Sequence, residues 1–144
     1  MNYSKKINIV VAGLGNVGSH VIKSIADINN NLVDKTKIQF NILGISAKDK
    51  TKKRIFNVDD YNWVDNPLEL LNLSNCDILI ELIGEEKGVS YDLIKKALEK
   101  NIHVITANKA LLSINGKDLF DIADKNKTKL LFEASVGGGI PIIK

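Results

Sequence analysis

A glycine string between an apolar run and an amphipathic stretch constrains the fold of this 144-residue chain more than any other feature. Residues 7–12 form a short apolar run, which is typical of a strand buried on both faces. Apolar side chains then recur at helical spacing across residues 17–28. A strand that turns tightly into a helix is the first half of a strand-helix-strand unit, so the sequence predicts a parallel sheet.

The rest of the chain continues this alternation of strands and helices. The predicted strands cover residues 38–45, 77–83, 102–106 and 130–134, and the predicted helices cover residues 68–73, 89–100 and 109–126. We expect the asparagines at 29–31 to end the first helix, and Asn115 and Gly116 to break the last one. Right-handed crossovers then give an α/β fold of the Rossmann type, a doubly wound, mainly parallel sheet flanked by helices. We expect one domain over residues 1–144, with its ligand at the carboxyl ends of the strands.

Composition excludes several classes of protein. The chain is 44% hydrophobic and 26% charged, as in globular domains, and no apolar run is long enough to span a bilayer. The N-terminus has no signal-peptide pattern, so we expect a cytoplasmic protein. Cys76 is the only cysteine, which excludes a disulfide framework, and His20 and His103 are too scattered to suggest a metal site. A net charge of +3 with Arg54 as the only arginine does not indicate nucleic-acid binding.

The glycine string fits the pattern G-x-G-x-x-G in the context that dinucleotide binding requires. Gly13 permits the tight turn, Gly15 leaves room for a pyrophosphate, and Gly18 lets helix and strand pack closely. Asn16 and Val17 lie where the backbone N–H groups at the helix start point toward the phosphates. An ordinary glycine-rich turn is the alternative, but the strand before it and the helix after it favour a dinucleotide site.

The end of the second strand bears on which dinucleotide binds. A site selective for NAD usually carries an acid there, whereas this strand ends at Ser46 without one, and Asp49 is only close by. The side chains that could neutralise a 2′-phosphate follow at once: Ser46, Lys48, Lys52, Lys53 and Arg54. A solvated charged loop explains the same residues. The sequence therefore favours NADP over NAD and leaves both open.

Two strings near the end of the chain are more specific than the glycine string. They are TANKALL at residues 106–112 and FEASVGGGIPII at residues 132–143. Together with ELIG at residues 81–84, they resemble homoserine dehydrogenase in the same order along the chain. The resemblance implies a reversible, NAD(P)-linked interconversion of L-homoserine and aspartate 4-semialdehyde. It also implies a catalytic and cofactor-binding Lys109, and cofactor contacts at Gly84 and Thr106.

The resemblance further implies a monovalent-cation loop. Carried over, Glu133 and the carbonyls of Val136, Gly138 and Ile140 would hold a sodium ion with oxygen ligands. A glycine hinge between two domains is the alternative, and both can hold together.

Two features depart from the family pattern. Glu85 and Glu86 follow Gly84 where a second glycine is usual, and Lys48 with Asp49 replaces an Arg-Asp pair.

The family's substrate and dimerisation domain follows the GGGIP segment, so we expect residues 136–144 to begin the connection to it. We expect this chain alone to bind the dinucleotide without turnover, as a monomer or a weakly associated species. The whole protein is expected to be a homodimer acting on a small-molecule substrate, without nucleic-acid or membrane partners. Two alternatives stay open. One is the cofactor domain of another small-metabolite reductase, such as dihydrodipicolinate reductase, and the other is a non-catalytic nucleotide-binding module.

Overall fold

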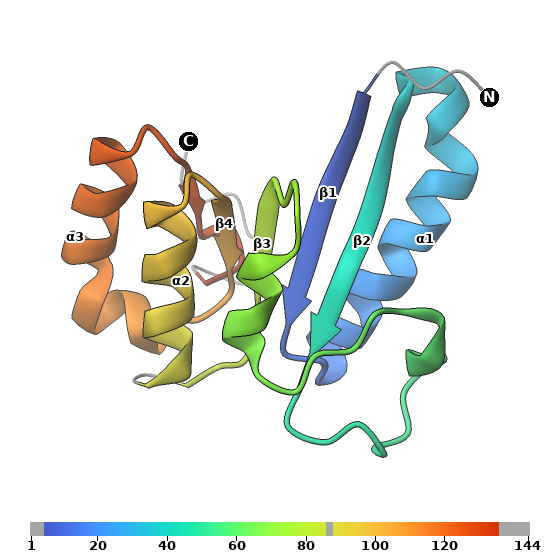
Figure 1. Ribbon diagram of the computed structural model, residues 1–144, viewed down its shortest axis with the longest axis horizontal. Coiled ribbons are helices and arrows are strands. Elements are labelled where there is room, and N and C mark those ends of the chain that lie inside the picture. Colours follow the sequence, from blue (N-terminus) through green and yellow to red (C-terminus); the bar gives the residue numbers. More distant parts are fainter. Residues whose placement is uncertain (1–4, 86–87, 136–144) are drawn as a thin grey trace.

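The computed structural model describes residues 5–85 and 88–135. They form a five-stranded parallel sheet in the order β2-β1-β3-β4-β5, with helices on both faces (Figure 1). The strands are β1 (Lys5–Ala12), β2 (Ile38–Ser46), β3 (Ile78–Glu81), β4 (His103–Thr106) and β5 (Leu130–Leu131). The helices are α1 (Asn16–Thr36), α2 (Val89–Glu99) and α3 (Lys109–Lys125), and 3-10 turns cover Val58–Asp60, Pro67–Asn72 and Glu133–Ser135. The predicted doubly wound α/β class is confirmed.

Two apolar clusters lie on opposite faces of the sheet, because successive strand residues point to opposite sides. Val10 and Ala12 of β1 pack with α2, α3 and the 67–72 turn in one cluster. Ile9 and Val11 pack with α1 in the other. Both faces of β1 are therefore buried, which explains why the segment lacks the alternation of a half-exposed strand.

The strand order places a switch point beside β1. The chain moves from β1 to β2 on one side, and β3 then returns to the other side of β1. Connections that leave β1 in opposite directions open a crevice at the carboxyl ends of the strands. The loops after β1, β2, β3 and β4 meet at this carboxyl edge, toward which the β1 and β2 arrows of Figure 1 point.

Helix α1 is longer than the sequence predicts. It runs to Thr36, through the asparagines that we expected to end it. The Asn29 side chain donates to the Phe40 carbonyl at 2.6 Å and accepts from the Phe40 N–H at 2.9 Å. A tertiary contact thus uses the amide group that would otherwise compete for the helix backbone, and the expected end at 29–31 is wrong.

Other segment boundaries also differ from the predictions. Helix α3 is continuous across Gly116, which is buried against the Phe120 ring, so the expected break is wrong. Strands β3 and β5 are shorter than predicted, and a 3-10 turn follows β5 where more strand was expected. In the part of the chain that the structure describes, no helix is both long and apolar enough to cross a membrane.

Candidate cofactor-binding cleft

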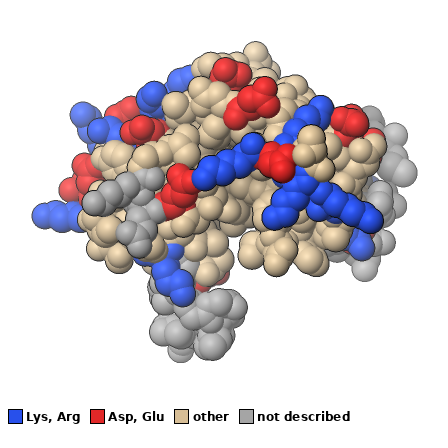
Figure 2. Space-filling view, turned by 90° about the horizontal axis from the view of Figure 1, so that it is seen from below, with Lys and Arg blue, Asp and Glu red and all other residues tan. Residues whose placement is uncertain are grey.

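A cleft of about 500 Å³ lies at the carboxyl edge of the sheet. It is formed by the loops after β1, β2 and β3 together with the start of α2. Its lining residues are Gly13, Leu14, Gly15, Ser46, Ala47, Lys48, Asp49, Lys52, Arg54, Asp65, Pro67, Leu82, Ile83, Glu85 and Val89. Seen from this edge, Lys and Arg side chains form a group at the right of the surface, and others are dispersed among acidic side chains at the centre and left (Figure 2). The cleft combines apolar walls with cations, as a phosphate-bearing ligand requires.

A second hollow, of about 640 Å³, lies beside α1 and is lined almost wholly by apolar side chains. Ile78, Ile80 and Ile105 form its floor on β3 and β4, and Val17 of α1 borders it. Although it is larger, its wall offers few polar groups to orient a charged dinucleotide. The cleft at the carboxyl edge is therefore the candidate site.

The glycine loop has the geometry that the sequence predicts. The Gly13 N–H donates to the Ser46 carbonyl at 2.8 Å, and Gly13 has a φ of +95°, which favours glycine. A Cβ on Gly18 would lie 2.0 Å from the Gly13 carbonyl oxygen, so α1 starts in close contact with the loop. A Cβ on Gly15 would meet nothing within 4 Å. Gly13 and Gly18 thus serve the fold, while Gly15 leaves open space at the cleft.

Besides the open space at Gly15, the Ser46 hydroxyl also indicates that this cleft fits a ligand. Ser46 ends β2 and is 1% exposed. Among the residues that the structure describes, its Oγ is the buried side-chain polar atom without a hydrogen-bond partner. Buried hydroxyls are normally paired, so this one has a donor and an acceptor available at the wall of the cleft. In a Rossmann fold, the ribose next to the adenine lies at this strand end. An unpaired hydroxyl here and the open space at Gly15 both fit a bound dinucleotide.

Arg54 holds the loop after β2 against the glycine loop. Its guanidinium donates to the Leu14 carbonyl at 3.2 Å and to the Asp49 carbonyl at 2.6 Å. It also donates to the carbonyls of Lys50 and Lys52, at 3.3 and 2.8 Å. Four backbone acceptors use most of the five guanidinium N–H donors. Arg54 therefore holds the loop backbone in place. From the sequence it is one of the side chains that could neutralise a 2′-phosphate.

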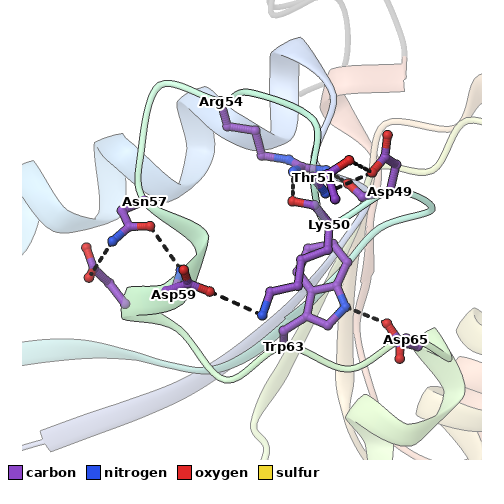
Figure 3. Close-up of polar contacts among 9 residues, drawn as sticks. Asp49, Lys50, Thr51, Arg54, Asn57, Asp59, Trp63 and Asp65 are labelled. Atoms are coloured by element: carbon purple, nitrogen blue, oxygen red, sulfur yellow. Dashed lines mark hydrogen bonds and ion pairs between the residues drawn. The ribbon is translucent and has the colours of Figure 1, made fainter.

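Neighbouring contacts stiffen the same loop (Figure 3). The Arg54 guanidinium lies 5.6 Å from the centre of the Trp63 ring, and the Trp63 indole donates to Asp65 at 2.7 Å. Asp49 accepts bonds from the Thr51 hydroxyl and N–H at 2.7 and 2.8 Å, and the hydroxyl is the main cause that lowers the pKa of Asp49. The Asp49 carboxylate therefore holds a turn within the loop.

We expect Arg54→Lys to lower the free energy of unfolding by about 1–3 kcal/mol and to loosen the loop. Lysine keeps the positive charge but lacks the planar fork that binds several carbonyls at once. Urea unfolding and the Trp63 emission spectrum measure the two effects. Lys53→Arg, an exposed neighbouring change, is the control. If Arg54→Lys matched the original chain in both measurements, charge alone would explain the role of Arg54.

An ion pair joins the loops after β2 and β3. Lys48 Nζ lies 3.2 Å from Glu85 Oε1, and the two side chains are 93% and 41% exposed. Both residues line the cleft. The Glu85 carboxylate thus faces the cleft. There it neutralises the Lys48 ammonium group, which would otherwise attract a phosphate. An exposed pair of this kind adds little to stability, so a stronger anion can displace it.

None of the remaining predicted cofactor residues lines the cleft, and Asn16 and Val17 border the apolar hollow beside α1 instead. Asn16 and Val17 are exposed in the first turn of α1, and Gly84 is exposed, with a φ of +80°. Thr106 is fully buried, and its hydroxyl donates to Glu81 at 2.6 Å. Thr106 does not line the cleft in this structure, so a cofactor contact there stays a prediction.

Lys109 is exposed as the first residue of α3, at the carboxyl edge. The preceding Asn108 caps this helix, because its side chain accepts from the Leu111 N–H at 3.1 Å. The Asn108 amide also donates to the Glu85 carbonyl at 2.6 Å. The start of α3 is thereby fastened to the loop after β3.

The predicted cation loop lies mostly outside the described residues. Glu133 is exposed and begins the last 3-10 turn, whereas Val136, Gly138 and Ile140 are not described, nor is Glu86. Within residues 5–85 and 88–135, no group of three or more His, Cys, Asp or Glu side chains is placed to hold a metal ion. The sodium site stays a prediction.

Several lining residues were missed from sequence. Asp65 and Pro67 come from a segment without a motif, which an isolated bridge between Ile45 and Trp63 brings beside β2. Val89 opens α2 and also lines the cleft. Only its place after a strand-end loop could have indicated it.

Cys76 is a free, half-buried cysteine. Burial raises the pKa of its thiol from 9.0 to about 11. We expect alkylation by iodoacetamide at pH 8 to be about a hundredfold slower in the folded chain than in urea, because the thiolate is that much rarer. Above pH 9 the unfolded chain loses the thiol proton first, so this group lowers stability as the pH rises toward 11. Equal alkylation rates in both states would contradict this.

The comparisons with known proteins point to one family. Residues 13–133 match the family model described as homoserine dehydrogenase, NAD binding domain. The homoserine dehydrogenase of Bacillus subtilis is 35% identical over 147 residues, which cover 97% of this chain and 32% of the relative. That of Helicobacter pylori is 38% identical, covering 97% and 32%. The crystal structure of S. aureus homoserine dehydrogenase aligns with a TM-score of 0.85 and 40% identity, covering 94% of this chain and 34% of the other. The chain thus spans about a third of the length of the relatives that it matches.

Proposed function

Since the chain belongs to the homoserine dehydrogenase family and contains its NAD-binding domain, we propose that the whole protein interconverts L-homoserine and aspartate 4-semialdehyde. Residues 1–144 form its cofactor-binding part and bind a nicotinamide dinucleotide without turnover by themselves. One observation carries this proposal. At the carboxyl edge, the open space at Gly15 adjoins a cleft whose wall holds the unpaired Ser46 hydroxyl.

The cofactor, when bound, supplies hydride exchange between its nicotinamide ring and the substrate carbon. The residues of this chain would bind and orient it. The open face at Gly15 admits the pyrophosphate, and the N–H groups at the start of α1 donate to it. Ser46 holds the adenosine ribose. Lys109 stabilises negative charge on the substrate oxygen or supplies its proton.

We propose further that NADP(H) is preferred to NAD(H). No acid ends β2 at the ribose position, and Lys48 and Lys52 line the same cleft. The Glu85 carboxylate opposes this preference, because it pairs with Lys48. A 2′-phosphate would have to compete with Glu85 for the ammonium group, so Glu85 sets a limit to the selectivity.

Calorimetric titration of the purified 144-residue chain with NADPH and NADH tests both parts. We expect both to bind and NADPH to bind more tightly. Glu85→Gln should strengthen NADPH binding about twofold to fivefold and leave NADH less changed, and Lys48→Gln should do the opposite. High salt should reduce the differences. Tighter binding of NADH would refute the preference, and no binding of either would refute the site.

A second assay addresses turnover. Homoserine-dependent formation of NADPH or NADH is expected from the whole protein and not from the 144-residue chain. Activity of the short chain above a no-enzyme control would disprove the proposal that residues 1–144 bind the dinucleotide without turnover. An inactive whole protein that still binds NADPH would disprove the proposed reaction alone.

A further inference from the structure

A buried carboxylate lies beneath the half of the cleft that the glycine loop does not form. Glu81 ends β3 and is fully buried. Its Oε1 accepts from the Ile83 N–H at 2.9 Å and from the Ser90 hydroxyl at 3.1 Å. Its Oε2 accepts from the Thr106 hydroxyl at 2.6 Å. One side chain thus ties together the loop after β3, the start of α2 and the end of β4.

The network extends from Glu81 to the start of α3. The Thr106 hydroxyl accepts from the Asn108 N–H at 3.0 Å while it donates to Glu81. Asn108 then caps α3 and donates to the Glu85 carbonyl at 2.6 Å. Lys109 is the next residue, so two hydrogen bonds fix the backbone before it relative to Glu81.

This carboxylate has no cationic partner among the ion pairs of the described residues. Burial of a charge costs several kcal/mol unless hydrogen bonds compensate, and an apolar side chain avoids that cost. The neighbouring Leu79 and Ile80 show what a strand here ordinarily carries. A carboxylate differs from them in one respect that matters. It accepts several directed hydrogen bonds and can fix the relative positions of several loops.

We propose that Glu81 is a positioning residue for the nicotinamide half of the bound dinucleotide. It acts through Thr106 and Asn108 on Lys109, and through Ile83 on the loop that carries Gly84 and Glu85. The adenosine half rests on the glycine loop and β2, to which Glu81 makes no side-chain hydrogen bond in the described structure. This inference rests on the proposed function, because it requires a nicotinamide dinucleotide in the cleft.

The test compares two ligands, NADPH and 2′-phospho-ADP-ribose, which lacks the nicotinamide ring. In Glu81→Gln one of the two acceptor oxygens becomes an amide donor, so the side chain can no longer accept from Ile83 and Ser90 on one side and from Thr106 on the other. We expect the affinity of the 144-residue chain for NADPH to fall about fivefold to thirtyfold. The affinity for 2′-phospho-ADP-ribose should change less than twofold. A purely structural role would lower both affinities together, along with the melting temperature.

Variants of Thr106 keep the test valid if Glu81→Gln does not fold. Thr106→Val removes the hydroxyl at nearly constant shape and should reproduce the selective loss for NADPH. Thr106→Ser restores the hydroxyl and should recover most of the lost affinity. Ser113→Ala, which removes an exposed hydroxyl bond within α3, is the control and should change neither affinity.

The outcomes separate the two proposals. If the unmodified chain binds neither ligand, the proposed function fails. If the unmodified chain binds NADPH and 2′-phospho-ADP-ribose equally tightly, the role of Glu81 is overturned while dinucleotide binding stands. The same holds if Thr106→Val loses affinity for the two ligands alike. A Thr106→Ser variant as weak as Thr106→Val would also overturn it.

Discussion

Gly15→Ala is expected to leave the fold intact and to lower the affinity for NADPH by at least about tenfold. A Cβ at this position would meet no atom within 4 Å, and Gly15 has no left-handed φ that a side chain would strain. Alanine lowers the conformational entropy of the unfolded chain, so stability should stay equal or rise by up to about 1 kcal/mol. The added methyl group would instead occupy the space through which the pyrophosphate approaches the backbone.

The matched comparison is Gly18→Ala, which adds the same methyl group three residues later. Its Cβ would lie 2.0 Å from the Gly13 carbonyl oxygen, a backbone atom that cannot rotate away. We expect it to lower the free energy of unfolding by about 3 kcal/mol or more. Urea unfolding and NADPH titration on both variants distinguish the two roles. If Gly15→Ala bound NADPH like the original chain, the pyrophosphate would not lie at this loop.

The sequence predicts the fold and half of the cleft because both depend on local patterns. Buried parallel strands are apolar without alternation, and β1 has that pattern next to a glycine string whose turn has few alternatives. The loops after parallel strands necessarily meet at one edge. The placement of Gly13, Gly15, Ser46 and Lys48 around one cleft follows from these two facts.

Other features depend on contacts between distant residues, and the sequence does not reveal them. Asn29 continues the helix because its amide finds Phe40, 11 residues away. Arg54 looks like one more cation of a basic loop until its guanidinium is seen among backbone carbonyls. Glu81 looks like the polar end of a strand, and only its three hydrogen-bond donors, two of them from distant segments, give it a further meaning.

Lys109→Gln is expected to lower kcat of the whole protein by about 10²–10⁴-fold while leaving stability equal or slightly higher. Lys109 occupies the first position of α3, where the helix dipole disfavours a cation by about 0.3–1 kcal/mol. Asn108 already caps this helix, so the lysine adds nothing to its start. Lys109 destabilises the start of α3 and lies at the carboxyl edge of the sheet, so its presence is better explained by its charge acting on a ligand.

Steady-state kinetics in both directions, together with urea unfolding, check this. Lys117→Gln, an exposed lysine further along α3, is the control and should change neither quantity appreciably. The division between constants is informative, because loss of an interaction made only in the transition state lowers kcat, whereas loss of ground-state binding raises KM. A Lys109→Gln enzyme with unchanged kcat and a raised KM would make Lys109 a binding residue. A variant that was less stable and fully active would remove it from the site altogether.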